Sequence, residues 1–312
     1  MRDEIEKIGV KAYTLKFLKE KGIFKENLYI SENLPARQKF IKDLEACGFK
    51  DGDELSCRFS HPTKTIYLPR TIANSFNEAY EFYKVNIRKD FIILIHNLMH
   101  AKYAGTITKV DTELFLEFVE GDWNADYSLN MDTAIFSGGE STWYLYQKIR
   151  RVPYVSEADV KYKEVRPVND NLAKTMNQKI ASKINLINEI LSSEYNSLEL
   201  LIDMDGNFQP LKLLNIRSLT RHIPTKLQDE VFEIKTPHDF IRWDKKTKLL
   251  ISIPANIDKA DALLSVISEI KKYTDIVYIS YGILSHPAIL LREAGLKVER
   301  KMSNYKVLKF KY

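Results

Sequence analysis

SYGILSHPAILLREAGLKV, residues 280–298, contains the pattern that decides the fold of the C-terminal part of the chain. It overlaps an apolar run, residues 275–280, whose β-branched and aromatic side chains predict a buried strand. Gly282 suits a turn, Pro287 suits the first turn of a helix, and Gly295 is a helix stop signal. We therefore expect a strand, a tight turn and a helix of about two turns.

His286 stands at the expected start of this helix, where the first backbone N–H groups have no partner within the helix. The helix dipole adds positive potential at the same point, so the position suits an anion such as a phosphoryl group. Imidazole is largely neutral near neutral pH and offers a nucleophilic ring nitrogen. Two interpretations follow from the pattern: His286 carries a phosphoryl group, or it is a capping or surface histidine.

The residues around His286 form the motif G-x-x-S-H-x-A-I-x-x-R-E-x-G. This motif resembles the phosphohistidine swivelling domain of phosphoenolpyruvate synthase, pyruvate phosphate dikinase and rifampin phosphotransferase. The matching positions here are Gly282, Ser285, His286, Ala288, Ile289, Arg292, Glu293 and Gly295. The resemblance implies that His286 is phosphorylated by ATP and carries the phosphoryl group to an acceptor. Two positions depart from the family pattern, because Pro287 replaces a small residue and Leu284 a polar one.

Length and composition predict a globular protein of two domains. The 312 residues exceed the usual size of one core, and the contents of 45% apolar and 29% charged residues argue against disorder. The net charge of +5 favours anionic ligands only weakly. It is too small to indicate nucleic acid as a partner. Cys47 and Cys57 are too few for a disulfide framework or a zinc cluster and predict reduced thiols in the cytoplasm. No apolar run approaches the roughly 18 residues of a membrane span, so no membrane role is expected.

Residues 221–240 carry two prolines and many charges, which predicts a linker or hinge. After it, strand and helix patterns alternate: KLLISIP (248–254), a helix at 259–272, the strand at 275–280, the helix behind His286 and a closing strand YKVLKFKY (305–312). The alternation predicts a small, mostly parallel sheet covered by helices, with His286 at a carboxyl strand end. We expect a first domain at 1–222, a linker at 223–236 and a second domain at 237–312.

The first part mixes helices and strands in another order. Helix patterns occupy residues 10–21, 75–87 and 171–193. Strand patterns are ELSCRFS (54–60), FIILIHN (91–97), YAGTITKV (103–110) and ELFLEFVEG (113–121), followed by a hairpin at 198–217 that turns at Asp205–Gly206.

Strand alternation in the hairpin gathers polar side chains. It places Glu199 and Asp203 on one face of the first strand, and Asn215 and Arg217 on one face of the second. Carboxylate and amide oxygens can bind magnesium, and a guanidinium can bind phosphate. The pattern is equally compatible with a solvated sheet face that contains one ion pair.

The hairpin also resembles the end of the ATP-grasp domain in the same dikinases, with a motif of the form E-W-A-x-D-x-x-G then L-x-x-L-Q-x-R. Glu199 and Arg217 match it, and Asn215 stands for the glutamine. Upstream, IGVKAYTL (8–15) resembles G-G-K-A-x-N-L and puts Lys11 at the ATP-binding lysine. SCRFSHP (56–62) resembles R-S-S-A and puts Arg58 at the phosphate-binding arginine.

The resemblance thus implies a mixed α+β and α/β fold, with an ATP-grasp-like N-terminal domain followed by a small α/β phosphohistidine domain. It implies ATP bound by Lys11, Arg58, Glu199, Asn215 and Arg217, with Mg²⁺ on Glu199 and Asn215. The strand at 91–97 resembles V-V-V-Q-x-M-V, with His96 at the glutamine position. A metal site at His96 and His100 is a weaker alternative, because a closed site needs four ligands.

Two departures leave two functions open. TKTIYLPRTIAN (63–74) has no glycine where the family has a phosphate-binding glycine loop, so Lys64 or Arg70 would have to contribute. No acceptor domain of the family fits in the chain. The chain is therefore expected to be a short dikinase-like phosphotransferase with an unknown small-molecule or protein acceptor on another chain. The alternative is a non-catalytic nucleotide-binding regulatory subunit.

Overall fold

The computed structural model describes residues 2–62, 68–99, 101–120, 131–156, 159–192, 195–203, 208–214, 230–252, 260–280, 282, 286–301 and 304–312. The chain forms two compact units. Unit 1 comprises Met1–His100 and Gln209–Leu213, and unit 2 comprises Ala101–Phe208 and Leu214–Tyr312. Each unit has its own sheets and core, so the expectation of a mixed α/β chain with several sheets is confirmed.

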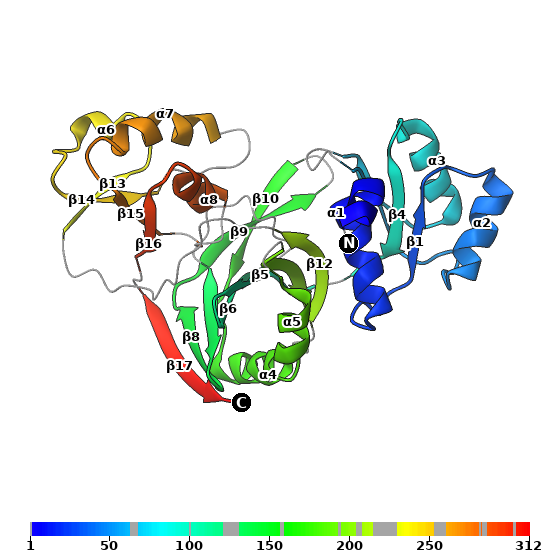
Figure 1. Cartoon of the computed structure of the whole chain (residues 1–312), viewed down its shortest axis with the longest axis horizontal. Helices are drawn as coiled ribbons and strands as arrows, with labels where there is room; N and C mark the ends of the chain where they lie inside the picture. Colours follow the sequence, from blue (N-terminus) through cyan, green and yellow to red (C-terminus); the bar gives the residue numbers. More distant parts are fainter. Residues whose placement is uncertain are drawn as a thin grey trace. The chain divides into compact units, whose positions relative to one another are not determined.

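Unit 1 is an antiparallel sheet with helices on its faces (Figure 1). Its sheet runs in the order β1–β4–β2–β3. The elements are α1 (Arg2–Glu20), β1 (Leu28–Ser31), α2 (Arg37–Ala46), β2 (Leu55–Ser60), β3 (Arg70–Ala73), α3 (Phe76–Asn86) and β4 (Ile92–Asn97). Alternation along β2 sends Cys57 and Phe59 into a core with α2 and α3, and leaves Ser56, Arg58 and Ser60 on the opposite face.

Tyr83 of α3 holds the middle of this sheet in place. Its side chain is fully buried, and its hydroxyl accepts from the Arg58 N–H at 2.9 Å and donates to Leu94 O at 2.9 Å. A buried hydroxyl must be hydrogen-bonded, so these contacts fix α3 to both central strands. They also fix the backbone position of Arg58.

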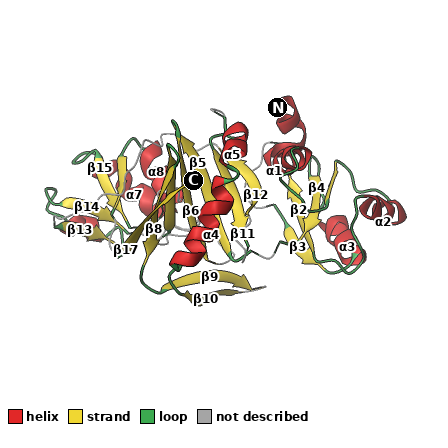
Figure 2. Cartoon of the chain, turned by 90° about the horizontal axis from the view of Figure 1, so that it is seen from below, coloured by secondary structure: helices red, strands yellow, loops and turns green. Residues whose placement is uncertain are grey.

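Unit 2 contains a large antiparallel sheet in which β11, β5, β6, β7, β8 and β17 follow one another (Figure 2). The bounds are β5 (Tyr103–Val110), β6 (Glu113–Glu120), β7 (Asp132–Ser137), β8 (Glu140–Tyr146), β11 (Ser197–Ile202) and β17 (Tyr305–Lys311). Helix α4 (Asp170–Ala181) packs on this sheet, where Trp143 Nε1 and Ser141 Oγ both donate to Asn177 Oδ1. The other elements of unit 2 are α5 (Ile184–Ile190) and the two-stranded pair β9 (Arg150–Ser156) and β10 (Asp159–Val165). Strand β12 (Phe208–Leu214) belongs to unit 1 over Gln209–Leu213.

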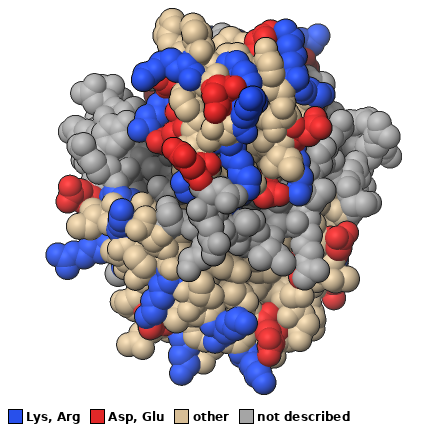
Figure 3. Space-filling model, turned by 90° about the vertical axis from the view of Figure 1, so that its left-hand side faces the viewer, with Lys and Arg blue, Asp and Glu red and all other residues tan. Residues whose placement is uncertain are grey.

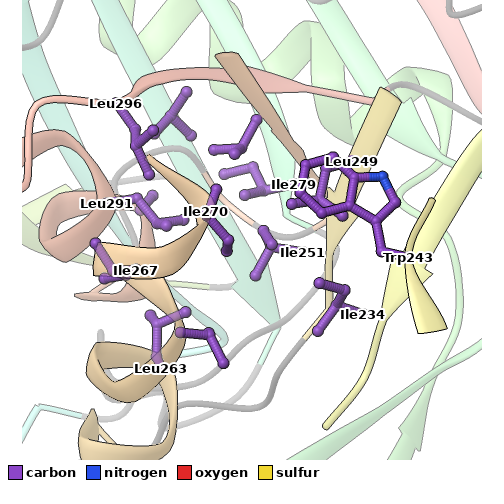
Figure 4. Close-up of a cluster of buried hydrophobic side chains, with 14 residues drawn as sticks. Ile234, Trp243, Leu249, Ile251, Leu263, Ile267, Ile270, Ile279, Leu291 and Leu296 are labelled. Atoms are coloured by element: carbon purple, nitrogen blue, oxygen red, sulfur yellow. The ribbon is translucent and has the colours of Figure 1, made fainter. Parts of the chain in front are cut away.

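A second sheet of unit 2 is parallel and runs β13–β14–β15–β16. Its elements are β13 (Val231–Ile234), α6 (Asp239–Arg242), β14 (Lys248–Ile251), α7 (Ala260–Ile270), β15 (Ile276–Ile279), α8 (His286–Glu293) and β16 (Lys297–Arg300). Apolar side chains of the strands meet those of α7 and α8 in one core (Figure 4), where Leu263, Ile270 and Leu291 are fully buried. The burial of these branched side chains supplies the main stabilisation of the layer.

Arg300, the last residue of β16, ties the parallel sheet to the antiparallel one. Its guanidinium is 3% exposed and donates to Glu117 Oε1 at 3.1 Å, Thr133 Oγ1 at 2.5 Å and Met131 O at 2.6 Å. It also donates to the Tyr305 hydroxyl at 2.6 Å and lies over the Tyr305 ring. These partners come from β6, β7 and β17, so one buried charge joins four strands of the two sheets.

Most predicted elements are confirmed, with three differences. The closing strand YKVLKFKY does not belong to the parallel sheet: β17 pairs antiparallel with β8, and β16 takes the predicted place. The helix predicted at 171–193 is two helices, α4 and α5, which separate at Ser182 and Lys183. Strand β13 lies within the segment expected to be a linker, and residues 215–229 lie outside the described residues.

The surface seen in Figure 3 mixes basic and acidic side chains, as the small net charge predicts. Among the helices that the structure describes, none combines the length and the apolar character needed to cross a membrane.

Replacement of Glu117 by leucine should lower the free energy of unfolding by about 3 to 5 kcal/mol, because Arg300 then stays buried without this counter-charge. The double variant Glu117→Leu with Arg300→Leu removes both charges. Its free energy of unfolding should therefore fall less than that of Glu117→Leu alone. Denaturant titration measures both effects. Lys272→Ala is the control, since its pair with Glu269 is exposed and should contribute about 1 kcal/mol or less. A double variant less stable than Glu117→Leu would contradict the expectation.

Candidate functional site

In unit 1, the segments that carry Lys11 and Arg58 lie side by side. Gly9 interrupts α1 with a left-handed φ of 79°, and a Cβ there would lie 2.6 Å from Ser60 Oγ and 2.5 Å from His61 O. Only glycine permits this approach of α1 to the end of β2. The Ala12 N–H also donates to Ser60 Oγ at 3.2 Å. The structure therefore brings together two of the segments that the motifs singled out.

A third segment reaches the same helix. Thr14 Oγ1, which is fully buried, accepts from the Leu213 N–H at 3.2 Å and donates to Val10 O at 2.6 Å. This bond places the end of β12 beside α1, three residues after Lys11. Asn215 and Arg217 follow Leu213 closely in the chain but lie outside the described residues.

Arg58 faces another arginine across the sheet. In the antiparallel pair β2–β3, Arg58 and Arg70 are directly opposite one another, so their side chains leave the sheet on the same face. Arg58 is half-buried and donates from Nε to Ser56 Oγ at 3.1 Å, while Arg70 is exposed. Like charges at opposed positions destabilise a sheet, and an anion bound between them would relieve that cost. Lys64 lies outside the described residues.

His96 of β4 lies on the same face as Arg58. Its ring is 2% exposed, lies edge-on to Phe24, and its Nδ1 is 2.8 Å from Asn97 O. Burial, and secondly the charge of Arg58, lower the pKa of His96 to about 4. The imidazole is therefore neutral at physiological pH, like the glutamine that the motif has there. No group of three possible metal ligands occurs among the residues that the structure describes, and His100 lies outside them.

Glu199 lies in β11 of unit 2, opposite Thr106 of β5. Along this strand Leu198 and Leu200 are buried while Glu199 and Leu201 are half-buried, so the predicted alternation is confirmed. The Glu199 carboxylate thus has access to solvent, as a ligand of a hydrated metal ion requires.

Helix α8 begins at His286 and ends two residues before Gly295, which has a left-handed φ of 84°. The predicted strand and helix are confirmed in position, and of the predicted turn only Gly282 is among the described residues. Gly282 in the turn is buried, and a Cβ there would lie 2.7 Å from Met131 Cγ and 2.8 Å from Glu117 Oε2. A glycine is therefore needed for space at position 282, because its backbone lies directly against Met131 and Glu117 of unit 2.

Three charged residues of unit 2 are buried: Glu117, Arg292 and Arg300 are each at most 4% exposed. Burial lowers the pKa of Arg292 to about 10, although the charges of Glu117 and Glu293 act in the opposite direction. A neighbouring buried pair joins Asp132 Oδ2 to Arg150 Nη2 at 2.6 Å. Sequence analysis missed Glu117 and Arg300; the available signal was a glutamate in the middle of the otherwise apolar run ELFLEFVE.

No family model matches the chain, and no curated protein matches it. Solved structures of several ligases and synthases resemble it in part. D-alanine–D-alanine ligase from Bacillus anthracis, complexed with ATP, has 12% identity and a TM-score of 0.34 over 65% of this chain and 54% of its own. N5-carboxyaminoimidazole synthase from Aspergillus clavatus has 15% identity and a TM-score of 0.39, over 67% and 44%. The chain spans about half the length of these proteins. Both TM-scores are under 0.5, so these similarities carry no argument about function.

The depressed pKa of His96 predicts an acid-sensitive unit 1. Between pH 6.5 and about 4 the unfolded state binds a proton that the folded state excludes, so stability falls as the pH falls through this window. The free energy of unfolding should fall by a value on the order of 3 kcal/mol between these two pH values. The variant His96→Gln should lose less over the same range, measured by denaturant titration at several pH values. His238→Gln, at an exposed site, should keep the wild-type profile. If the stability of His96→Gln depended on pH as that of wild type does, the lowered pKa assigned to His96 would be contradicted.

Proposed function

We propose that the chain is an ATP-dependent phosphotransferase in which His286 accepts a phosphoryl group from ATP and carries it to an acceptor on another molecule. In this proposal residues 1–222 form an ATP-grasp-like domain and residues 237–312 a carrier domain, as in a short relative of the dikinases. ATP would bind through Lys11, Arg58, Glu199, Asn215 and Arg217, with Mg²⁺ on Glu199 and Asn215.

The observation that carries the proposal is the opposed pair Arg58 and Arg70 beside the α1 segment that holds Lys11. Guanidinium groups bind phosphate oxygens with two parallel hydrogen bonds, and a lysine adds a point charge. The close approach of α1 at Gly9 brings the Lys11 segment to this face. The set of residues suits a polyphosphate better than a carboxylate, because several cations contribute.

The chemistry would need positioning and charge neutralisation more than covalent help from other side chains. A lone pair on a His286 ring nitrogen forms the N–P bond to the β phosphorus, and the bond from that phosphorus to the α–β bridging oxygen breaks to release AMP. The γ phosphoryl group must then pass to water or phosphate to leave one phosphoryl group on His286. Mg²⁺ would neutralise phosphate charge, and the start of α8 at His286 would favour the bound anion.

A non-catalytic nucleotide-binding subunit is the second candidate. Its support is the absence of glycine in residues 63–74, where backbone N–H groups would otherwise approach the phosphates. In this candidate the cations of unit 1 bind ATP, but no phosphoryl group reaches His286.

Phosphoryl labelling separates the two candidates. The protein is incubated with Mg²⁺ and ATP labelled at the β or the γ phosphate, and acid-labile protein label and AMP are followed. We expect label from the β position on wild type and on the control His238→Ala, and none on His286→Ala. ATP binding without label or AMP would leave only the non-catalytic candidate.

ATP binding itself tests the unit 1 cations. Arg58→Ala should weaken ATP binding at least about tenfold, since charge-assisted hydrogen bonds are lost. Arg37→Ala is the matched control, because Arg37 is an exposed arginine of the same unit that donates to Asn77 Oδ1. Unchanged calorimetric affinity in both Arg58→Ala and Glu199→Ala would sink the ATP-site assignment.

A further inference from the structure

A cavity of about 240 Å³ lies at the amino ends of β14 and β15. Its lining includes Trp243, Lys245, Lys246, Lys248, Tyr273 and Tyr278. His286 follows the carboxyl end of β15, so the cavity lies at the opposite end of the parallel strands. The proposed phosphoryl transfer makes no use of these residues.

The cavity is lined by positive charge. Three lysines, Lys245, Lys246 and Lys248, contribute to it, and none of its described lining residues is acidic. The nearby Asp244 is engaged in its own loop, where its carboxylate accepts from the N–H groups of Lys246 and Thr247 and from the Thr247 hydroxyl. A concave surface with charge of one sign attracts ligands of the opposite sign, so the cavity should select anions.

The lining also contains three aromatic residues, Trp243, Tyr273 and Tyr278. The Lys245 ammonium lies 3.8 Å from the Phe240 ring centroid and 5.2 Å from that of Trp243, and donates to Phe240 O at 2.6 Å. Lys245 has a φ of 65°, which is unfavourable for a residue with a side chain. Such a conformation persists where surrounding contacts enforce it, and it clusters at binding sites. Tyr273 lines the cavity and is 51% exposed, although its ring also contacts the rings of Phe240 and Trp243.

The volume limits the ligand. Pockets for drug-sized molecules are roughly 300 to 1,000 Å³, so a cavity of about 240 Å³ suits a ligand smaller than most drug-sized molecules. A flat ring can stack on Tyr273 while lysines bind the anion. We propose that this cavity is a binding site for a small aromatic anion of the nucleoside monophosphate class. The site is independent of the ATP and His286 assignments.

AMP, adenosine and ribose 5-phosphate are the probes, titrated by calorimetry into the full chain. We expect AMP to bind at least about tenfold more tightly than either fragment, since ring and phosphate both contribute. Lys246→Ala with Lys248→Ala should weaken AMP binding about tenfold or more, and so should Tyr273→Ala. Lys272→Ala is the matched control: it removes an exposed, ion-paired lysine outside the cavity and should leave AMP affinity unchanged.

Three outcomes would overturn the proposal. The first is AMP affinity unchanged in the double lysine variant. The second is AMP binding that is lost in Arg58→Ala but kept in the cavity variants, which would assign AMP to unit 1. The third is a single-stranded oligonucleotide that binds more tightly than AMP and depends on the same residues. Thermal unfolding verifies that each variant is folded; should Tyr273→Ala fail this check, the double lysine variant decides alone.

Discussion

The buried guanidinium of Arg300 is the interaction on which the arrangement within unit 2 depends. It joins the last residue of β16 to Glu117, Thr133, Met131 O and Tyr305. Burial of an isolated charge would cost many kcal/mol, so the site requires the Glu117 carboxylate and the further acceptors that bond Nη1 and Nη2. The same carboxylate lies against Gly282, so the ion pair is also next to the backbone that follows β15.

The buried pair Glu117–Arg300 also affects the free energy of separating the two sheets. When two surfaces joined by a buried ion pair separate, both charges regain water, which offsets the lost attraction. An apolar interface of the same area has no charges to rehydrate, so its opening has no such favourable contribution to the free energy. The Glu117–Arg300 pair is thus specific in geometry, and its rehydration offsets part of the free energy of opening.

Local pattern was sufficient to predict the more strongly apolar elements, but it missed others such as β7, β8 and α2 and did not give the pairing partners. The apolar runs at β2, β4, β5, β6 and β15 have a clear period, so the strands were predicted nearly to the residue. β17 was assigned to the wrong sheet, because its pairing with β8 depends on residues about 165 positions away in sequence. Arg300 and Glu117 read as surface charges in isolation, and their burial is a property of the tertiary fold. The pair Arg58 and Arg70 required the register of β2 and β3.

The central claim is that Arg300 holds the segment from β15 to α8 in place. Amide hydrogen exchange in wild type and Arg300→Leu tests it most directly, because exchange reports local opening. The account predicts faster exchange in residues 276–293 of the variant and unchanged exchange in β2 and β4 of unit 1. Unchanged exchange in residues 276–293, or the same increase in both regions, would contradict it.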